Sequence, residues 1–204
     1  MKSYWDKYYN KFLPPSKPTA FAIYCKNFLK NYHNTLLDIG CGNGRDTIYF
    51  NKSKINCYGL DKSYQAIKIL KKKNNKIAKK FINSDFSKFN YSKLKEKISV
   101  YSRFSIHSIN KEKELNFFKR INKSNNIEYL FIEVRTIYDE LFGVGKKIRK
   151  NEYFTSHYRR FIDPKIFKKQ IKKKFTIKLF KVSRNFAKYK DENPLVLRVI
   201  AKKK

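Results

Sequence analysis

Gly40, Gly42 and Gly44 stand at alternate positions and form the part of the chain best suited to hold a ligand against the backbone. Glycine lacks a Cβ, so it permits tight turns and close approach of a ligand to the main chain. The preceding apolar run, Thr35–Ile39, predicts a strand. In an open parallel sheet, the turn after the first strand is where nucleotide ligands bind. This glycine pattern alone fits both a dinucleotide site and a site for another nucleoside.

Three acidic residues surround this turn. Asp38 precedes the glycines, and Asp61 and Asp85 follow the next two predicted strands. A carboxylate at position 38 suits a ligand with an ammonium group and repels a pyrophosphate. Asp61 is placed to bind ribose hydroxyls, and Asp85 and Phe86 offer an acceptor and an aromatic face to a base. Each acid alone also fits an ordinary turn, but together they indicate a nucleoside with a positive, amino-acid-like tail.

The segment Leu36–Asp46 (LLDIGCGNGRD) resembles motif I of class I S-adenosylmethionine-dependent methyltransferases. The resemblance implies S-adenosylmethionine as cofactor, S-adenosylhomocysteine as product, and an in-line displacement at the sulfonium methyl. Trp5–Tyr9 (WDKYY) resembles a segment that small bacterial members fold over the cofactor. We take Cys41 as a packing residue of the turn rather than a nucleophile. The resemblance implies a cofactor site made of Asp38, Gly40, Cys41, Gly42, Gly44, Arg45, Asp61, Lys62, Asp85, Phe86, Ser102 and Tyr9.

The methyl acceptor is expected after the fourth predicted strand, at Tyr101–His107 (YSRFSIH), because this segment faces the transferred methyl in the family. An Asn/Asp-Pro-Pro-aromatic motif, typical of base amino methylation, is absent here, and so is a Pro-Cys that would attack a pyrimidine ring. His107 has a pKa near working pH and can accept a proton from a hydroxyl or an ammonium. Arg103 can hold a phosphate or carboxylate in a bidentate fork. The alternatives are a hydrogen-bonded structural histidine and a surface ion pair.

Other polar residues are expected on the same side of the sheet. Glu133 ends the fifth predicted strand and joins Arg103 and His107 as a catalytic candidate. A glycine-containing segment follows, and we expect a loop or lid over residues 136–162. The expected substrate-binding residues are Arg103, His107, Arg135, His157, Tyr158, Arg159 and Arg160. The two adjacent arginines also fit a solvated basic turn. This region resembles small methyltransferases of bacterial surface-polysaccharide (capsule or lipooligosaccharide) gene clusters, which implies a small acceptor, phosphorylated or sugar-linked.

The net charge of +33 usually indicates an anionic partner such as nucleic acid or a membrane surface. Abundant Lys, Asn, Ile, Phe and Tyr with scarce Gly and Pro also fit an AT-rich genome, and the lysines are spread along the chain. We therefore expect a methyltransferase that modifies nitrogen or oxygen of a small anionic metabolite. The alternatives are an RNA methyltransferase drawn to its substrate by charge, and a binding module that keeps the fold without chemistry.

Residue counts limit the other possibilities. The three cysteines, Cys25, Cys41 and Cys57, form no CxxC pair, and an odd count argues against a disulfide framework. A reducing, cytoplasmic location is expected. Three histidines without clustered Cys or His ligands argue against a metal site. No apolar run is long enough to cross a membrane.

Alternating strands and helices predict a Rossmann-like, doubly wound α/β fold with a mostly parallel seven-stranded sheet. The expected strands are Thr35–Ile39, Ile55–Leu60, Lys80–Asn83, Ile98–Tyr101, Ile127–Val134, Phe175–Val182 and Leu195–Ala201, the last antiparallel. The expected helices are Ser3–Phe12, Thr19–Lys30, Asp46–Asn51, Tyr64–Lys73, Lys111–Lys123 and Pro164–Lys174. The first two helices form an N-terminal cap over residues 1–32. With 204 residues, 41% of them hydrophobic, we expect one domain over residues 1–204.

Overall fold

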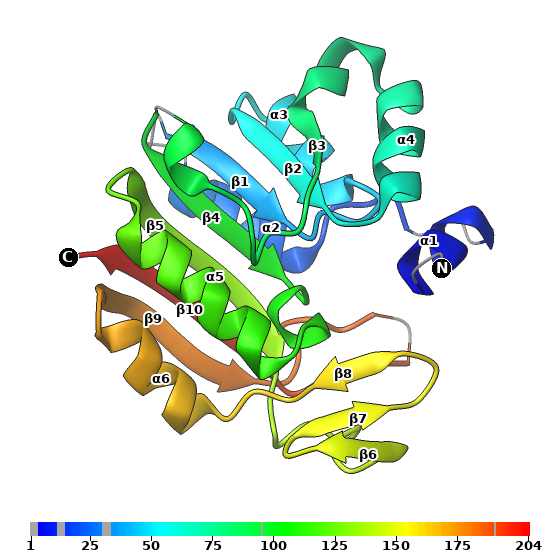
Figure 1. Cartoon of the computed structure of the whole chain (residues 1–204), viewed down its shortest axis with the longest axis vertical. Helices are drawn as coiled ribbons and strands as arrows, with labels where there is room; N and C mark the ends of the chain where they lie inside the picture. The colour runs from blue at the N-terminus through cyan, green and yellow to red at the C-terminus, as the bar shows by residue number, and fades with distance from the viewer. Residues whose placement is uncertain (1–3, 12–14, 30–33, 95, 190) are drawn as a thin grey trace.

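A seven-stranded sheet forms the centre of the computed structural model, which describes residues 4–11, 15–29, 34–94, 96–189 and 191–204 (Figure 1). The strand order is β3-β2-β1-β4-β5-β10-β9. The strands are β1 (Thr35–Ile39), β2 (Cys57–Asp61), β3 (Phe81–Asn83), β4 (Ile98–Arg103), β5 (Ile127–Arg135), β9 (Phe175–Ser183) and β10 (Val196–Lys203). Pairs from β3 to β5 are parallel, whereas β10 is antiparallel to β5 and β9. The predicted doubly wound sheet with an antiparallel last strand is confirmed.

The order of the strands determines where a ligand can bind. Asp38 of β1 lies opposite Gly59 of β2 on one side and Tyr101 of β4 on the other. The strand order reverses between β1 and β4, so the connections leave these two strands in opposite directions. A crevice forms at such a reversal, outside the carboxyl ends of the strands.

Helices cover both faces of the sheet. The α-helices are α1 (Tyr4–Lys11), α2 (Ala20–Leu29), α3 (Arg45–Lys52), α4 (Tyr64–Lys73), α5 (Lys111–Lys123) and α6 (Pro164–Lys172); the short 3-10 helices are η1 (Asn75–Lys80), η2 (Tyr91–Lys93) and η3 (Ile106–Ser108). In Figure 1, α5 and α6 lie in front of the sheet. Leu37 packs in the cluster that contains Phe117 of α5, whereas its neighbour Leu36 packs with Phe21 of α2. Both faces of β1 are therefore buried, which explains its continuous apolar sequence.

Helix boundaries follow the capping residues. Ser63 accepts a hydrogen bond from the Ala66 N–H and begins α4. Asp163 accepts from the Lys165 and Ile166 N–H groups and begins α6, with proline at the first helical position. The two expected N-terminal helices appear as α1 and α2, while Ser3, Phe12 and Lys30 lie outside the described residues.

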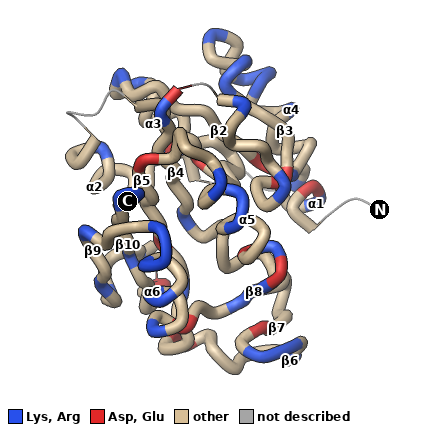
Figure 2. The backbone as a smooth tube through the Cα atoms, turned by 60° about the vertical axis from the view of Figure 1, so that its left-hand side comes forward, with Lys and Arg blue, Asp and Glu red and all other residues tan. Residues whose placement is uncertain are grey.

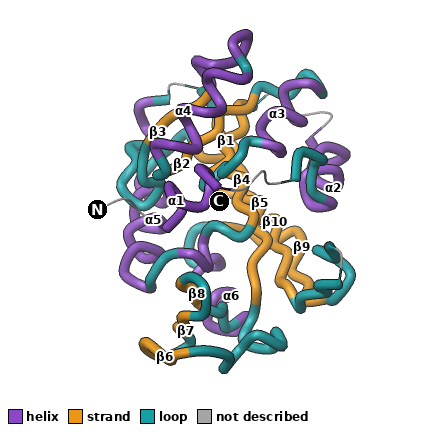
Figure 3. Tube along the Cα trace, turned by 90° about the vertical axis from the view of Figure 1, so that its right-hand side faces the viewer, coloured by secondary structure: helices purple, strands orange, loops and turns teal. Residues whose placement is uncertain are grey.

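A small second sheet occupies much of the segment that we expected to be irregular. Strands β6 (Lys146–Arg149), β7 (Glu152–Phe154) and β8 (Tyr158–Arg160) form an antiparallel meander, and Figure 3 shows it apart from the main sheet. The expectation of an irregular loop was wrong because β6 is exposed at every position and shows no apolar alternation. The remaining sequence signal is Asn151, whose φ of 62° marks the hairpin turn.

The surface charge is not concentrated on one element. Figure 2 shows Lys and Arg on elements throughout the fold. Within the described ranges, no helix combines the length and apolar character that a membrane crossing requires.

Candidate functional site

Two cavities adjoin at the carboxyl ends of β1 and β4. The turn cavity, of about 420 Å³, lies over the glycine turn. The basic cavity, of about 440 Å³, lies between the end of β5, the small sheet and residues 186–194. Both are lined by the same six residues, Trp5, Pro15, Arg45, Arg103, Phe104 and Ser108. A ligand in one cavity therefore shares a wall with a ligand in the other.

Most of the expected cofactor residues line the turn cavity. They are Tyr9, Asp38, Gly40, Cys41, Gly42, Arg45, Asp61, Lys62, Asp85 and Phe86. Gly40, Gly42 and Gly44 have φ values of 70°, 56° and 71°, which L side chains rarely adopt. The turn thus requires glycine at these positions, as the sequence indicated.

Asp61 joins the turn to the second strand. One carboxylate oxygen accepts a hydrogen bond from the Gly42 N–H at 2.8 Å, and the other accepts from the Ser63 N–H at 2.8 Å. Burial raises the pKa of Asp61. Each carboxylate oxygen keeps further acceptor capacity, so the side chain can also receive ligand hydroxyls.

Asp38 is buried beneath the turn. Its Oδ2 accepts a hydrogen bond from the Thr47 hydroxyl at 2.7 Å. Burial, followed by the nearby Asp46 carboxylate, raises the pKa of Asp38 to about 8. A positive ligand group beside this carboxylate would favour its ionised form, so the site suits an ammonium rather than a phosphate.

Helix α1 covers the turn. Asp6 accepts hydrogen bonds from the Ser63 hydroxyl at 2.7 Å and the Gln65 N–H at 3.3 Å. The Tyr9 hydroxyl lies so close to Gly42 that a Cβ at position 42 would overlap it. The WDKYY segment is thus placed over the turn cavity.

Two expected cofactor residues do not line either cavity. Gly44 backs the turn against α4, because a Cβ there would overlap Leu70 and approach Phe81. Ser102 is fully buried within β4. Side chains alternate along a strand, so Arg103 reaches the cavities and its neighbour Ser102 does not.

Phe104 is a site residue that sequence reasoning missed. It lines both cavities, and its φ of 60° is strained for a bulky side chain. The Arg103 guanidinium lies 4.0 Å from its ring centroid. The next residue, Ser105, donates a hydrogen bond from its hydroxyl to the Ile39 carbonyl at 2.5 Å, which joins the ends of β4 and β1. No local sequence signal marks this conformation.

Asp46 was also missed as an organiser of the site. Its carboxylate accepts hydrogen bonds from the Thr19 N–H, the Thr19 hydroxyl and the Tyr101 hydroxyl, each at 2.8 Å. These bonds fix the segment before α2, which lines the basic cavity, to α3 and β4. Thr19 capping α2 was the available signal, since its hydroxyl accepts from the Ala22 N–H.

His107 lies on η3, buried in the wall of the basic cavity. Its Nδ1 accepts a hydrogen bond from the Arg135 N–H at 3.2 Å. A lone pair on Nδ1 places the proton of the neutral ring on Nε2. Burial, and then the Arg135 charge, holds the pKa of His107 well below its usual range. The ring is therefore neutral, with a donor at Nε2.

Glu133 and Arg135 are engaged by other side chains. The Glu133 carboxylate accepts from Arg198 Nε at 2.6 Å and from Arg103 Nε at 3.4 Å. The Arg135 guanidinium donates to Asp139 at 3.0 Å and to Glu192 at 2.7 Å. We interpret Glu133 as the anchor of Arg103, because both of its oxygens are already bound by guanidinium groups.

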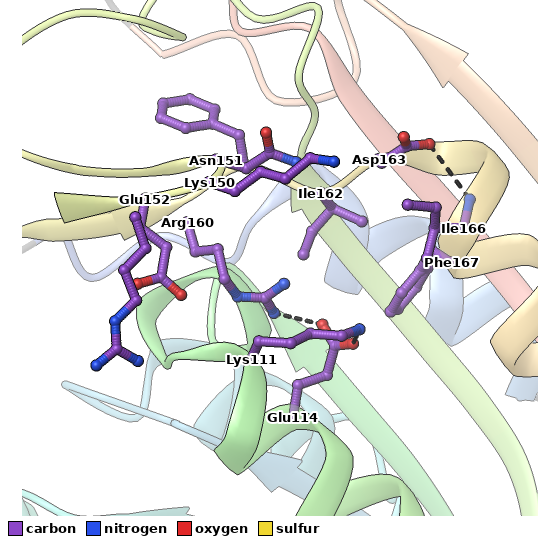
Figure 4. Close-up of a pocket in the computed structure, with 12 residues that line it drawn as sticks. Lys111, Glu114, Lys150, Asn151, Glu152, Arg160, Ile162, Asp163, Ile166 and Phe167 are labelled. Carbon is purple, nitrogen blue, oxygen red and sulfur yellow. Dashed lines mark hydrogen bonds and ion pairs between the residues drawn. The ribbon is translucent and has the colours of Figure 1, made fainter. Parts of the chain in front are cut away.

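Arg160 is absent from the lining of the basic cavity, and its side chain points toward Glu114 (Figure 4). Its guanidinium forms a buried ion pair with Glu114 and donates to the Ile109 carbonyl at 3.0 Å. It lines a separate rear cavity of about 330 Å³. The expectation of an anion-binding pair of arginines was wrong for Arg160, because adjacent strand residues point to opposite faces.

His157 connects the small sheet to α1. Its ring lies 5.2 Å from the Tyr4 ring and 5.4 Å from the Trp5 ring, measured between centroids. Burial, and then the Arg159 charge, lowers the pKa of His157 to about 4.

We expect the free energy of unfolding to fall as the pH is lowered from about 6.5 to about 4. In this window the unfolded chain binds a proton at His157 that the folded chain does not. His157→Gln should lose this part of the pH dependence, with His107 unchanged in both proteins. Urea unfolding of both proteins at several pH values measures it, and parallel curves would contradict the assignment.

The described part of the chain holds no group of three or more His, Cys, Asp or Glu side chains suited to a metal ion.

One known protein family matches part of the chain. Residues 36–124 match the family described as "Methyltransferase domain". These 89 residues, of the 204 in the chain, are similar to a methyltransferase domain. The domain runs from β1 to the end of α5 and contains the glycine turn, Asp61, Asp85 and His107. The expectation of a methyltransferase is thereby confirmed. No curated protein gives a significant match.

Solved structures share the fold around this methyltransferase domain. The glycopeptide N-methyltransferase MtfA, solved with S-adenosylhomocysteine, gives a TM-score of 0.68 at 13% identity over 92% of this chain and 90% of that one. The PH0226 protein from Pyrococcus horikoshii OT3 gives 0.68 at 14% identity, with 97% and 99% covered. An S-adenosylmethionine-dependent methyltransferase from Clostridium acetobutylicum ATCC 824 gives 0.66 at 15% identity, with 97% and 95% covered. At these identities the likeness is one of fold.

Proposed function

We propose that this chain is an S-adenosylmethionine-dependent methyltransferase that methylates nitrogen or oxygen of a small anionic metabolite. The observation that carries the proposal is the pair of cavities with a shared wall. The turn cavity offers acceptors suited to a nucleoside with a positive tail, and the basic cavity offers cations to a second molecule. A methyl group carried by the ligand of the turn cavity would, at the shared wall, face the molecule in the basic cavity.

The turn-cavity residues fit S-adenosylmethionine, which supplies the methyl group when bound. Asp38 would hold the ammonium end and Asp61 the ribose hydroxyls. Asp85 would accept from the adenine amino group, beside the ring of Phe86. The Asp85 carboxylate is oriented by the Ser87 N–H at 2.9 Å. The likeness to MtfA, which was solved with S-adenosylmethionine and S-adenosylhomocysteine, supports this cofactor.

Acceptor-side residues would align and polarise the second molecule. Arg103 lies at the shared wall, stacked on Phe104, and His107 would donate a hydrogen bond from Nε2 to the acceptor. Alignment alone is worth on the order of 7–11 kcal/mol of a bimolecular barrier. The proposed acceptor is phosphorylated or sugar-linked, in keeping with the resemblance to enzymes of surface-polysaccharide clusters. The dispersed surface charge (Figure 2) supports such an acceptor over RNA.

Calorimetry with S-adenosylmethionine and S-adenosylhomocysteine tests the cofactor, with adenosine as the control that lacks the charged tail. We expect both cofactor forms to bind more tightly than adenosine. Mass spectrometry then follows methyl transfer to a panel of phosphorylated amines and sugar nucleotides, with bulk RNA beside it. Absence of cofactor binding would reject the function, and methylation of RNA alone would select the nucleic-acid alternative.

A further inference from the structure

The basic cavity contains more positive than negative side chains. Its charged lining residues are Lys17, Arg45, Arg103, Arg135, Arg159 and Lys188, with Glu133 and Glu192 as the carboxylates. Glu133 also binds Arg198, which lies outside this lining. The cavity is thus electropositive even after its internal ion pairs are counted.

The four guanidinium groups differ in how they are held. Arg135 is fixed by Asp139 and Glu192, and Arg103 by Glu133. Arg45 lines the turn cavity as well, so the cofactor side shares it. Arg159 lines only the basic cavity of the two and has no carboxylate within ion-pair distance among the described residues. It is the guanidinium most available to an acceptor.

Arg159 keeps one edge of its guanidinium group open. Nη1 donates to the Thr155 hydroxyl at 2.6 Å. Within the part of the chain that the structure describes, Nε and Nη2 make no hydrogen bond. These two nitrogens form the planar fork that matches two oxygens of a carboxylate or phosphoryl group.

The environment of Arg159 penalises its positive charge. Burial and the neighbouring Arg135 charge both lower the pKa of Arg159. A cation that is partly desolvated and repelled in this way gains from a bound anion. The strand pairing with Tyr153 holds the backbone of Arg159, and the Thr155 hydroxyl holds its side chain, so part of the entropy cost of ordering this side chain is not charged to anion binding.

We propose that Arg159 determines acceptor specificity by binding an anionic oxygen group, phosphoryl or carboxylate, through the fork of Nε and Nη2. That the bound anion belongs to the methyl acceptor rests on the proposed function, whereas the anion site itself does not. Arg159 does not line the turn cavity. The anionic group is therefore held at the small-sheet end, and the atom to be methylated extends toward the shared wall.

Trp5 provides the signal for a direct test, because it is the only tryptophan and lines the basic cavity. Its fluorescence is followed while inorganic phosphate, or acetate as the carboxylate probe, is titrated with and without S-adenosylhomocysteine. Wild-type protein should respond saturably, and the probe that binds more tightly identifies the anion class. Arg159→Gln should weaken that probe by about tenfold or more. Arg159→Lys keeps the charge without the planar fork, so its affinity for the anion should lie between those of wild type and Arg159→Gln.

Arg149→Gln is the matched control, since Arg149 is an exposed arginine of the same sheet that lines only the rear cavity. Equal anion affinity in Arg159→Gln and wild type, or no saturable response in wild type, would overturn the proposal. Calorimetry with S-adenosylhomocysteine should give the same affinity in all variants. Loss of that binding in wild type would instead remove the proposed function and leave the anion result standing.

Discussion

Gly42→Val is expected to lower the affinity for S-adenosylmethionine by about a hundredfold or more, which corresponds to roughly 2.8 kcal/mol. Valine would meet two obstacles at this position. The φ of 56° is unfavourable for a β-branched residue, and the added atoms would enter the space between the turn and Tyr9. Calorimetry with S-adenosylhomocysteine gives the affinity, and a thermal melt shows whether the variant is folded.

Gly143→Val is a control that separates the two effects of Gly42→Val, namely backbone strain at a positive φ and the filling of space that the cofactor needs. Gly143 has a φ of 89°, yet no atom lies within 4 Å of a Cβ built there. We expect this control to lose stability and keep cofactor affinity. The double variant Tyr9→Ala/Gly42→Val tests whether displacement of α1 is the cause, because it removes the ring and leaves the valine. Undiminished affinity in Gly42→Val would mean that the cofactor does not rest on this turn.

Glu133→Ala should lower the free energy of unfolding by about 3–5 kcal/mol, the usual cost of leaving a buried partner charge unpaired. Glu133 is 0% exposed and Arg198 is 5% exposed. Their ion pair at 2.6 Å joins β5 to β10, where the two residues lie directly opposite each other. Without the carboxylate, Arg198 and Arg103 would be left close together without their shared counter-charge. Urea unfolding at neutral pH measures the loss.

Glu140→Ala is the control of the same type. Glu140 pairs with Arg184 at 3.5 Å, but its side chain is 56% exposed. Exposed pairs contribute about 0–1 kcal/mol, so this variant should be nearly as stable as wild type. The stability of Glu133→Gln should lie between those of Glu133→Ala and Glu140→Ala, because glutamine keeps the shape of the side chain and one acceptor oxygen. Equal free energies of unfolding for Glu133→Ala and Glu140→Ala would show that the buried ion pair makes no net contribution to the stability of the fold.

Local signals account for what the sequence predicted. Positive-φ glycines and acids at strand ends are marked by residue type within a few positions, so the turn, Asp38 and Asp61 were found. The bond from Thr19 to Asp46 spans 27 positions, and nothing near either residue indicates the other. Arg159 and Arg160 are identical neighbours, and only the strand β8 separates their directions. That strand was missed because the small sheet lacks the apolar alternation that identifies strands.

The alternation along β8 also bears on how acceptor choice can evolve. A slip of one residue in strand register turns every side chain to the opposite face. In β8 such a slip would turn Arg160 to the face of the basic cavity and Arg159 to the opposite face. One inserted or deleted residue in the turn between β7 and β8 can therefore exchange which arginine meets the anion, without any substitution of a cavity residue. A change in the length of that turn can therefore alter anion recognition as directly as a substitution of a residue that lines the cavity.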